Sequence, residues 1–266
     1  MMKNLARYMR LYGHFVRFSL MGAMQFRFDF AFRILMDCSF YFVNVCFYKI
    51  VFMHTNQIAG WTESQVMLFM GAYLVIDAIN MTVFANGTWM IAQYVNNGEL
   101  DYYLLRPVSS FFFLSCRDFA FSSSINLLMA LGILGWAVHS YTGVITLDRY
   151  VLFTVFIFGG TYLYHLMRIL TLLPVFWLHS GRGFESLFWI LTRIMERPDV
   201  VYTGWIRWVL MIILPFIVVV SFPTRILFQE NIWGVVGYCV ATIVAFHYLV
   251  KYLWNLGLRN YSSASS

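Results

Sequence analysis

The chain has 266 residues, 61% of them hydrophobic and 11% charged, and its mean hydropathy is +0.71. A soluble domain carries about 25% charged residues and could not bury this much apolar surface, so soluble, disordered, collagen-like and nucleic-acid-binding classes are excluded. The composition predicts an all-α membrane protein, and the net charge of +6 indicates basic cytoplasmic loops rather than an acidic partner.

The first 29 residues alternate basic and bulky apolar side chains. Arg7, Arg10 and Arg17 interrupt the apolar residues too often for a membrane span. This pattern predicts an amphipathic helix that lies in the membrane interface with its Arg face toward anionic lipid headgroups. We expect residues 1–29 to form this helix and residues 30–266 to form one transmembrane domain.

Six apolar stretches are candidate membrane spans, for which about 20 residues are usual. They predict spans at about 31–52, 65–84, 119–137, 150–173, 206–220 and 232–250. The segment 179–204 is a polar connection in this prediction. Pro215 kinks the fifth span, and two roles for the kink stay open, a gating hinge and a packing feature.

The connections differ in their content of Lys and Arg. Most of these residues lie in the N-terminal segment, after the second span, after the fourth span and in the tail. The positive-inside rule therefore predicts that both termini are cytoplasmic.

No motif for catalysis is present. The sequence lacks GxxxxGK[ST], HExxH and GxSxG, its His residues are isolated, and its four Cys form no CxxC pair. We therefore expect no catalytic, cofactor or metal site in this chain.

The segment GELDYYLLRP at 98–107 is a short polar departure between the second and third spans. Gly98 ends one helix, acids begin the next helix where its dipole favours them, and Arg106-Pro107 ends it. A capped helix with bulky apolar side chains suits either a groove on another protein or the lipid surface. The residues we assign to this surface are Gly98, Glu99, Leu100, Asp101, Tyr102, Leu104, Arg106 and Pro107.

The stretch NNGELDYYLLRPVS resembles the cytoplasmic loop of the type-2 ABC exporter permease family, in its multidrug or uncharacterised branch. Residues 197–227, with Pro198, Pro215 and Pro223, and the ending WNLGLRNYSSASS are similar to the fifth span and the tail of that branch. The resemblance implies six spans after an amphipathic helix, in a bacterial cytoplasmic (inner) membrane. It also implies that the helix near 98–107 couples transport to ATP hydrolysis.

The same resemblance implies the partners. These are a second permease subunit, in a homo- or heterodimer, and a separate ATP-binding subunit that binds ATP and Mg. The missing P-loop is then expected, and the chain itself is not an enzyme. The aromatic, weakly charged spans favour a hydrophobic or amphipathic substrate, and nucleic acid is not among the expected partners.

Four polar residues lie inside the predicted spans. Asp77 and Asn80 share one face of the second span, and His165 and Arg168 share one face of the fourth. Ionisable groups at this depth are costly, by about 2.5–3.5 kcal/mol for Asp. They either line a translocation path or a cation site, or they hold the helices together. Arg168 either pairs with an acid such as Asp77 or extends to the inner headgroups.

The leading hypothesis is a permease subunit of an ATP-driven exporter. The alternative is a membrane-embedded enzyme that modifies lipids, which would gather Asp77, His165 and Arg168 in one cavity of a single protomer. A structural scaffold and an ion channel are weaker hypotheses.

Overall fold

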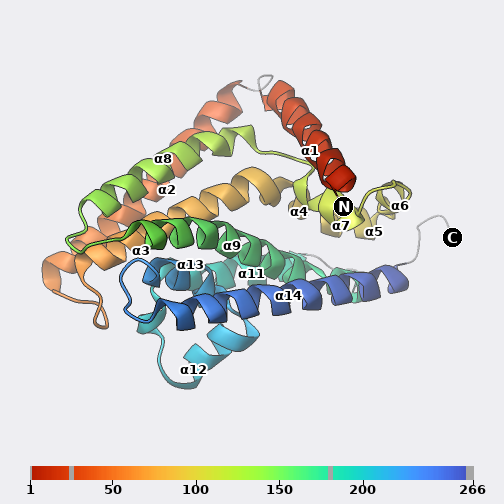
Figure 1. Ribbon diagram of the computed structural model, residues 1–266. Helices are drawn as coiled ribbons and strands as arrows, with labels where there is room; N and C mark the ends of the chain where they lie inside the picture. The colour runs from red at the N-terminus through yellow and green to blue at the C-terminus, as the bar shows by residue number, and fades with distance from the viewer. Residues whose placement is uncertain (1, 24–26, 179–181, 262–266) are drawn as a thin grey trace.

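The computed structural model describes residues 2–23, 27–178 and 182–261. Within these ranges the backbone is helical or irregular, apart from an isolated bridge between Ile58 and Trp61. The α-helices are α1 (Met2–Ala23), α2 (Arg27–His54), α3 (Glu63–Asn80), α4 (Asn86–Trp89), α5 (Ile91–Asn96), α6 (Asp101–Leu104), α7 (Ser110–Cys116), α8 (Phe121–His139), α9 (Leu147–Leu172), α10 (Val175–Leu178), α11 (Arg182–Thr192), α12 (Gly204–Trp208), α13 (Phe216–Arg225) and α14 (Ile232–Asn260) (Figure 1).

Five helical segments of the described chain are long and apolar enough to cross a membrane, at Ile34–His54, Glu63–Asn96, Phe121–His139, Leu147–Leu178 and Ile232–Asn260. They confirm an all-α membrane architecture and agree with five of the six predicted spans. The predicted N-terminal helix forms as α1, which ends at Ala23. Its position in the membrane interface stays a prediction, and residues 24–26 and the end of the tail, 262–266, lie outside the described residues.

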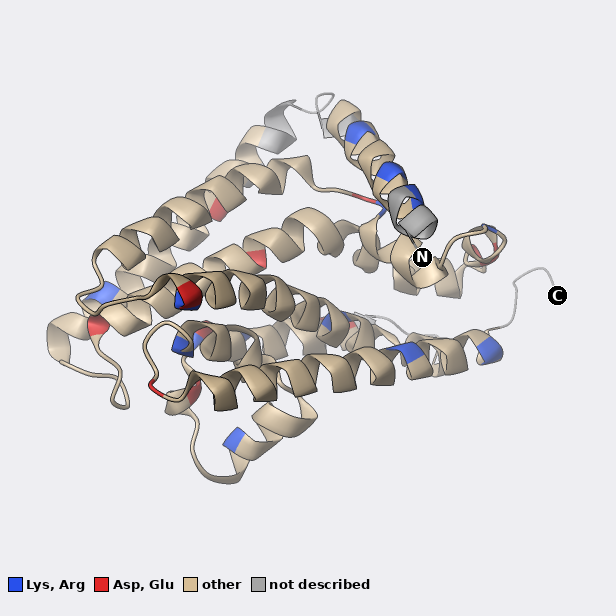
Figure 2. Ribbon diagram, viewed as in Figure 1, with Lys and Arg blue, Asp and Glu red and all other residues tan. Residues whose placement is uncertain are grey.

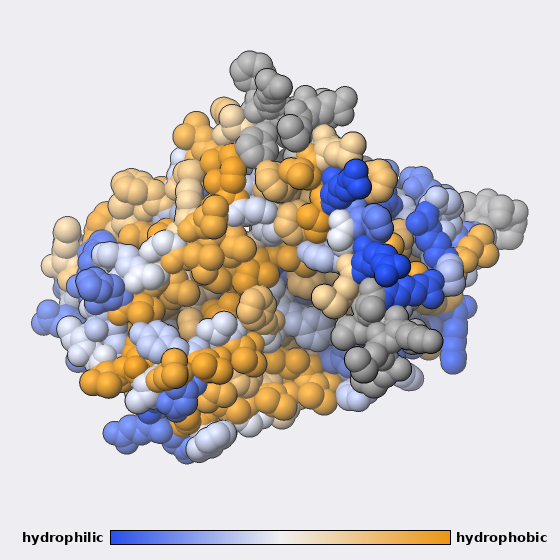
Figure 3. Space-filling view, turned by 45° about the horizontal axis from the view of Figure 1, so that its top comes forward, coloured by the Kyte–Doolittle hydropathy of each residue, from blue (hydrophilic) through white to orange (hydrophobic). Residues whose placement is uncertain are grey.

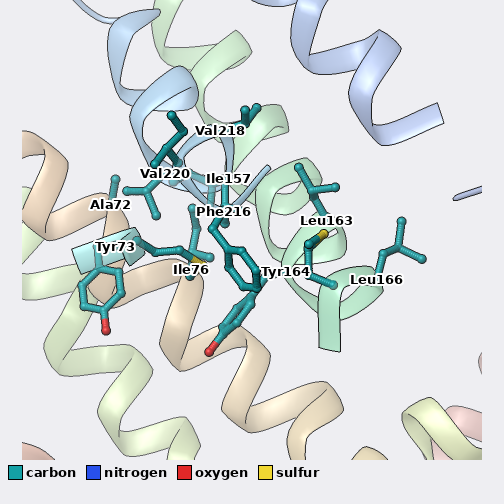
Figure 4. Close-up of a cluster of buried hydrophobic side chains, with 14 of the residues drawn as sticks. Ala72, Tyr73, Ile76, Ile157, Leu163, Tyr164, Leu166, Phe216, Val218 and Val220 are labelled. Carbon is teal, nitrogen blue, oxygen red and sulfur yellow. The ribbon is translucent and has the colours of Figure 1, made fainter. Parts of the chain in front are cut away.

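The helix α3 is the centre of the bundle, and its side chains are buried almost without interruption from Val66 to Ile76. It packs against α2, α8, α9 and α13. Small residues allow the closest approaches, because a Cβ at Gly71 would lie 2.8 Å from the Cα of Leu134, and one at Gly160 would overlap the carbonyl oxygen of Val219. Figure 4 shows the apolar cluster where α3, α9 and α13 meet.

The second predicted span ends too early at residue 84. The helical path continues through the π-helical turn η1 (Met81–Ala85) and through α4 and α5 to Asn96. Gly87 does not break it, because this glycine packs directly against the carbonyl oxygen of Leu114 in α7. The sequence segment 85–96, expected to be part of a mixed connection, is therefore a buried continuation of the span.

In the fifth predicted span, 206–220, the kink expected at Pro215 is a complete break between two helical limbs. The limbs Gly204–Ile213, which includes the π-helical turn η4 (Val209–Ile213), and Phe216–Arg225 meet at an angle of 92°, with Pro215 in the break. Arg207 on the first limb and Arg225 at the end of the second bind the same carboxylate, that of Asp199. The segment therefore turns back on itself, and we call it the hairpin 204–225.

The segment assigned to a polar connection instead runs along the bundle. Glu185 lies 3.5 Å from Arg168, near the last turns of α9. Asp199 binds Arg225, and nearby Leu227 accepts a hydrogen bond from Arg149 in the first turn of α9. Arg149 and Arg168 are separated by about 29 Å of helix, at 1.5 Å a residue. Residues 185–199 therefore cover nearly the whole length of α9 in the opposite direction.

The bundle has two polar ends. We call the end with α1, α5, α6, α7 and the last turns of α9 and α14 the α1 end, and the end with the hairpin 204–225 the hairpin end. Lys and Arg follow α1, and most other charges lie near helix ends (Figure 2). The surface over the long helices is largely hydrophobic, with hydrophilic residues gathered toward the ends (Figure 3).

Candidate functional site

The segment 98–107 forms a tight exposed turn at the α1 end. Gly98 has a φ of 71°, which ends α5, and the Glu99 amide donates to the Tyr94 carbonyl oxygen at 2.9 Å. This hydrogen bond across a left-handed glycine is the Schellman arrangement that closes a helix. The helix α6 that follows is one turn long, shorter than the sequence suggests.

One face of this turn is buried against the rest of the chain, and the other face is exposed. Leu100 is fully buried, whereas Leu105 is 86% exposed. Leu105 was not among the residues assigned to this surface from the sequence. The assigned residues that are exposed are Glu99, Tyr102, Leu104 and Pro107. Apolar side chains held outward on a fixed turn can fill a groove of another protein.

Arg106 does not extend into solvent. Its guanidinium lies 4.4 Å from the ring centre of Tyr102 and 4.7 Å from that of Phe113. Arg117 at the end of α7 donates to the hydroxyl of Tyr103. The two arginines thus hold the α6 turn against α7 through cation–π and hydrogen-bond contacts.

The helix α1 is attached to the chain that follows α6. Arg7 donates to the carbonyl oxygen of Pro107 at 3.0 Å, and the hydroxyl of Tyr8 accepts from the amide of Ser109 at 3.3 Å. Further along, Ser19 accepts from the amide of Phe119 at 3.1 Å. A displacement of the α6 turn would therefore pull on α1.

The end of the chain reaches the same turn. The phenol of Tyr261, just beyond α14, faces the backbone amides of Leu100 and Asp101. Burial and then the nearby Asp101 carboxylate raise the pKa of Tyr261, so this phenol is neutral at pH 7. Its buried oxygen has no hydrogen-bond partner among the described residues.

The four predicted intramembrane residues do not form one site. His165 is buried beside Ser115 at 3.0 Å and stacks on Phe84. Arg168 is buried with Glu185 at 3.5 Å and Phe188 under its guanidinium, so its acid is Glu185 rather than Asp77. Asn80 is buried at 5% exposure.

Asp77 alone of the four lines a cavity of about 610 Å³. The cavity lies between α2, α3, α8, α9 and α11. Its lining residues are Asp37, Phe40, Tyr41, Tyr73, Asp77, Met81, Asn86, Trp89, Ser123, Asn126, Tyr164, Trp189, Thr192, Arg193 and Glu196. Figure 4 shows the hydroxyl groups of Tyr73 and Tyr164 on the same side of the apolar cluster.

Glu196 is a cavity residue that the sequence prediction missed. It lies in the 3₁₀ turn η2 (Arg193–Glu196), which continues α11. The signal was its spacing from Trp189, Thr192 and Arg193, since positions i, i+3, i+4 and i+7 share one face of a helix. The segment resembled a polar loop because its charged residues lower its hydropathy.

A family model for "ABC-2 family transporter protein" matches residues 38–265. The chain belongs to the ABC-2 transporter family. No curated protein and no solved structure matched it. Members of this family are membrane transport components rather than enzymes, and the family implies an ABC transporter with an ATP-binding subunit.

Family membership agrees with the way the polar residues are distributed in this ABC-2 protein. A membrane enzyme would have gathered Asp77, His165 and Arg168, whereas their contacts separate them. Among the described residues, no group of three or more His, Cys, Asp or Glu is placed to hold a metal ion.

At the hairpin end, Asp199 is the most enclosed acid of the described chain, with an exposure of 0%. Its carboxylate accepts from Arg225 at 2.7 and 2.8 Å and from Arg207 at 2.9 Å, and its amide donates to Ser221. Arg225 lies 5.6 Å from the ring of Trp61 and also binds Gln229. This network joins both limbs of the hairpin to the 3₁₀ turn η3 (Asp199–Val201), which follows α11 and η2 in the chain.

Proposed function

We propose that this chain is the permease subunit of an ATP-driven exporter, and that the turn around α6 docks onto the ATP-binding subunit. The observation that carries the proposal is the braced, exposed turn itself. Leu105 points outward at 86% exposure while Leu100, Arg106 and Arg117 fix the backbone beneath it. A rigid surface of this kind transmits the movement of its partner instead of absorbing it.

The topology that supports this function places both termini in the cytoplasm of a bacterial cell. The segment 185–199 is then the fifth crossing of the cytoplasmic membrane, and the hairpin 204–225 enters and leaves on the outer side. Basic residues of α1 fall on the cytoplasmic side, as the positive-inside rule requires. Binding and hydrolysis of ATP with Mg belong to the partner subunit.

Apolar side chains of α2 face outward along its length, among them Phe42, Val43 and Phe47. In our proposal a second permease subunit, identical or homologous, packs beside this chain and the substrate passes between the two. The hydrophobic surroundings favour a hydrophobic or amphipathic substrate.

The test replaces Leu105 with Asp. The exposed side chain makes little contact within the chain, so the unfolding free energy should change by less than about 0.5 kcal/mol. A central apolar contact with the partner is worth about 2 kcal/mol or more, so binding of the ATP-binding subunit should weaken about 30-fold. Co-purification with the ATP-binding subunit tests this weakening.

The control is Val144→Asp, which changes a side chain of similar exposure, 89%, at the opposite end. This variant should retain the ATPase. If Leu105→Asp binds the ATPase and supports transport as the wild type does, the docking proposal is wrong.

A further inference from the structure

The cavity between α2, α3 and α11 combines carboxylates with aromatic rings. Asp77 and Glu196 line it from α3 and η2, and both are partly exposed within the bundle. Its volume of about 610 Å³ suits a drug-sized molecule, for which cavities of roughly 300–1,000 Å³ are usual.

These two carboxylates are placed differently from the other acids of the bundle. Among the described residues, no Lys or Arg lies within salt-bridge distance of Asp77 or Glu196, whereas Asp199 and Glu185 each have a guanidinium. The arginine in the lining, Arg193, is exposed, and together with Arg197 it lies near Glu196 without forming a salt bridge. The charged groups near Asp77 are the carboxylates of Asp37 and Glu196. An acid at this depth without a cation beside it is costly, and such residues are typical of substrate or ion sites.

A second, independent feature is the amide of Asn126. The side chain is 3% exposed and its Nδ2 donates to Asp37. No donor among the described residues reaches its buried Oδ1, although the residue lines the cavity. A buried carbonyl oxygen of this kind is normally hydrogen-bonded, so it favours a ligand that carries an N–H or a positively charged edge.

The remaining walls are aromatic. Trp89, Trp189 and Phe40 are partly exposed, and Tyr41, Tyr73 and Tyr164 are buried. Faces of Trp and Tyr attract cations, while the same rings accommodate apolar groups. Carboxylates and ring faces together select for positive charge and for hydrophobicity in one molecule.

We propose that this cavity binds lipophilic organic cations, such as quaternary ammonium, phosphonium or protonated aromatic amine compounds. The proposal names the substrate class of the permease proposed above and rests on that function for its role in transport. The site belongs to a single protomer and needs no nucleotide, so the isolated chain binds these cations.

The experiment measures saturable binding of radiolabelled tetraphenylphosphonium to the full chain, purified in nanodiscs of uncharged lipid. Tetraphenylborate has nearly the same shape and the opposite charge, and it should not bind saturably. Asp77→Asn and Glu196→Gln should each weaken phosphonium binding by at least about tenfold, because each removes one of the cavity's carboxylates. Trp89→Leu should weaken it about fivefold.

Matched controls are Asp148→Asn and Glu63→Gln, which make the same chemical changes outside the cavity. Both should bind like the wild type, and size-exclusion profiles identify any variant that misfolds. If Asp77→Asn misfolds, Glu196→Gln and Trp89→Leu decide the result.

Absence of saturable binding, equal binding of tetraphenylborate, or unchanged binding by folded cavity variants would overturn the proposal. Because this assay contains no ATPase, a negative result would not contradict the docking of the α6 turn onto the ATP-binding subunit. Conversely, a failure of ATPase co-purification would not contradict the cation site.

Discussion

Asp199 has two guanidinium groups around its carboxylate, whereas Asp77 has no Lys or Arg within salt-bridge distance among the described residues. Both acids lie within the same bundle. The first joins three segments of chain and leaves no space for a ligand, and the second faces a cavity. Depth alone therefore does not identify a functional acid in a membrane protein, because the surrounding charges decide its role.

If Asp199 is a structural acid, its removal should lower the free energy of unfolding of the chain. Asp199→Ala leaves Arg207 and Arg225 without their shared acid, and breaking a buried pair costs about 3–5 kcal/mol. We expect a loss of this size in the free energy of unfolding, measured by SDS titration of the purified chain. The control Asp148→Ala removes an exposed acid in the first turn of α9 and should lower the free energy of unfolding much less.

A smaller loss of unfolding free energy is expected when the close packing of α9 against the second limb of the hairpin is disturbed. Gly160→Ala places a methyl group against the carbonyl oxygen of Val219 in α13, and overpacking of this kind costs about 1–3 kcal/mol. In Gly159→Ala the methyl group meets only the end of the Ile243 side chain, at 3.0 Å. The same titration should therefore show a larger loss for position 160, and equal losses would show that α13 is not tightly seated.

The smallest change in stability is expected at the cavity. Asp77→Asn removes a charge that makes no ion pair among the described residues, so the desolvation cost disappears with it. The unfolding free energy should stay within about 1 kcal/mol of the wild type or rise, while cation binding falls. A loss as large as that of Asp199→Ala would mean that Asp77 is structural.

Most of the fold follows from apolar stretches of the right length. The spans over α2, α3, α8, α9 and α14 were predictable because each carries about 20 apolar residues between polar ends. Hydropathy could not distinguish the hairpin 204–225 from a span, since Pro215 divides an apolar segment whose return path depends on Asp199. Hydropathy also did not reveal α11 as a helix of the bundle, because the apolar residues of α11 occupy one face only.

The site was predictable in part. The tight turn at 98–107 was visible because Gly98 and Pro107 mark its limits, although α6 is a single turn. Asp77 was visible as an acid in an apolar stretch. Glu196 and Asn126 were not, because their roles depend on which helices pack together, and one sequence does not contain that information.

The hairpin 204–225 has a consequence for biosynthesis. Asp199 precedes this apolar segment in the chain and Arg225 ends it, so the acid leaves the ribosome first. By hydropathy alone the segment would have the properties of an ordinary span. We therefore expect the return path of this segment to form only after synthesis of Arg225, because it depends on an ion pair 26 residues apart rather than on hydropathy.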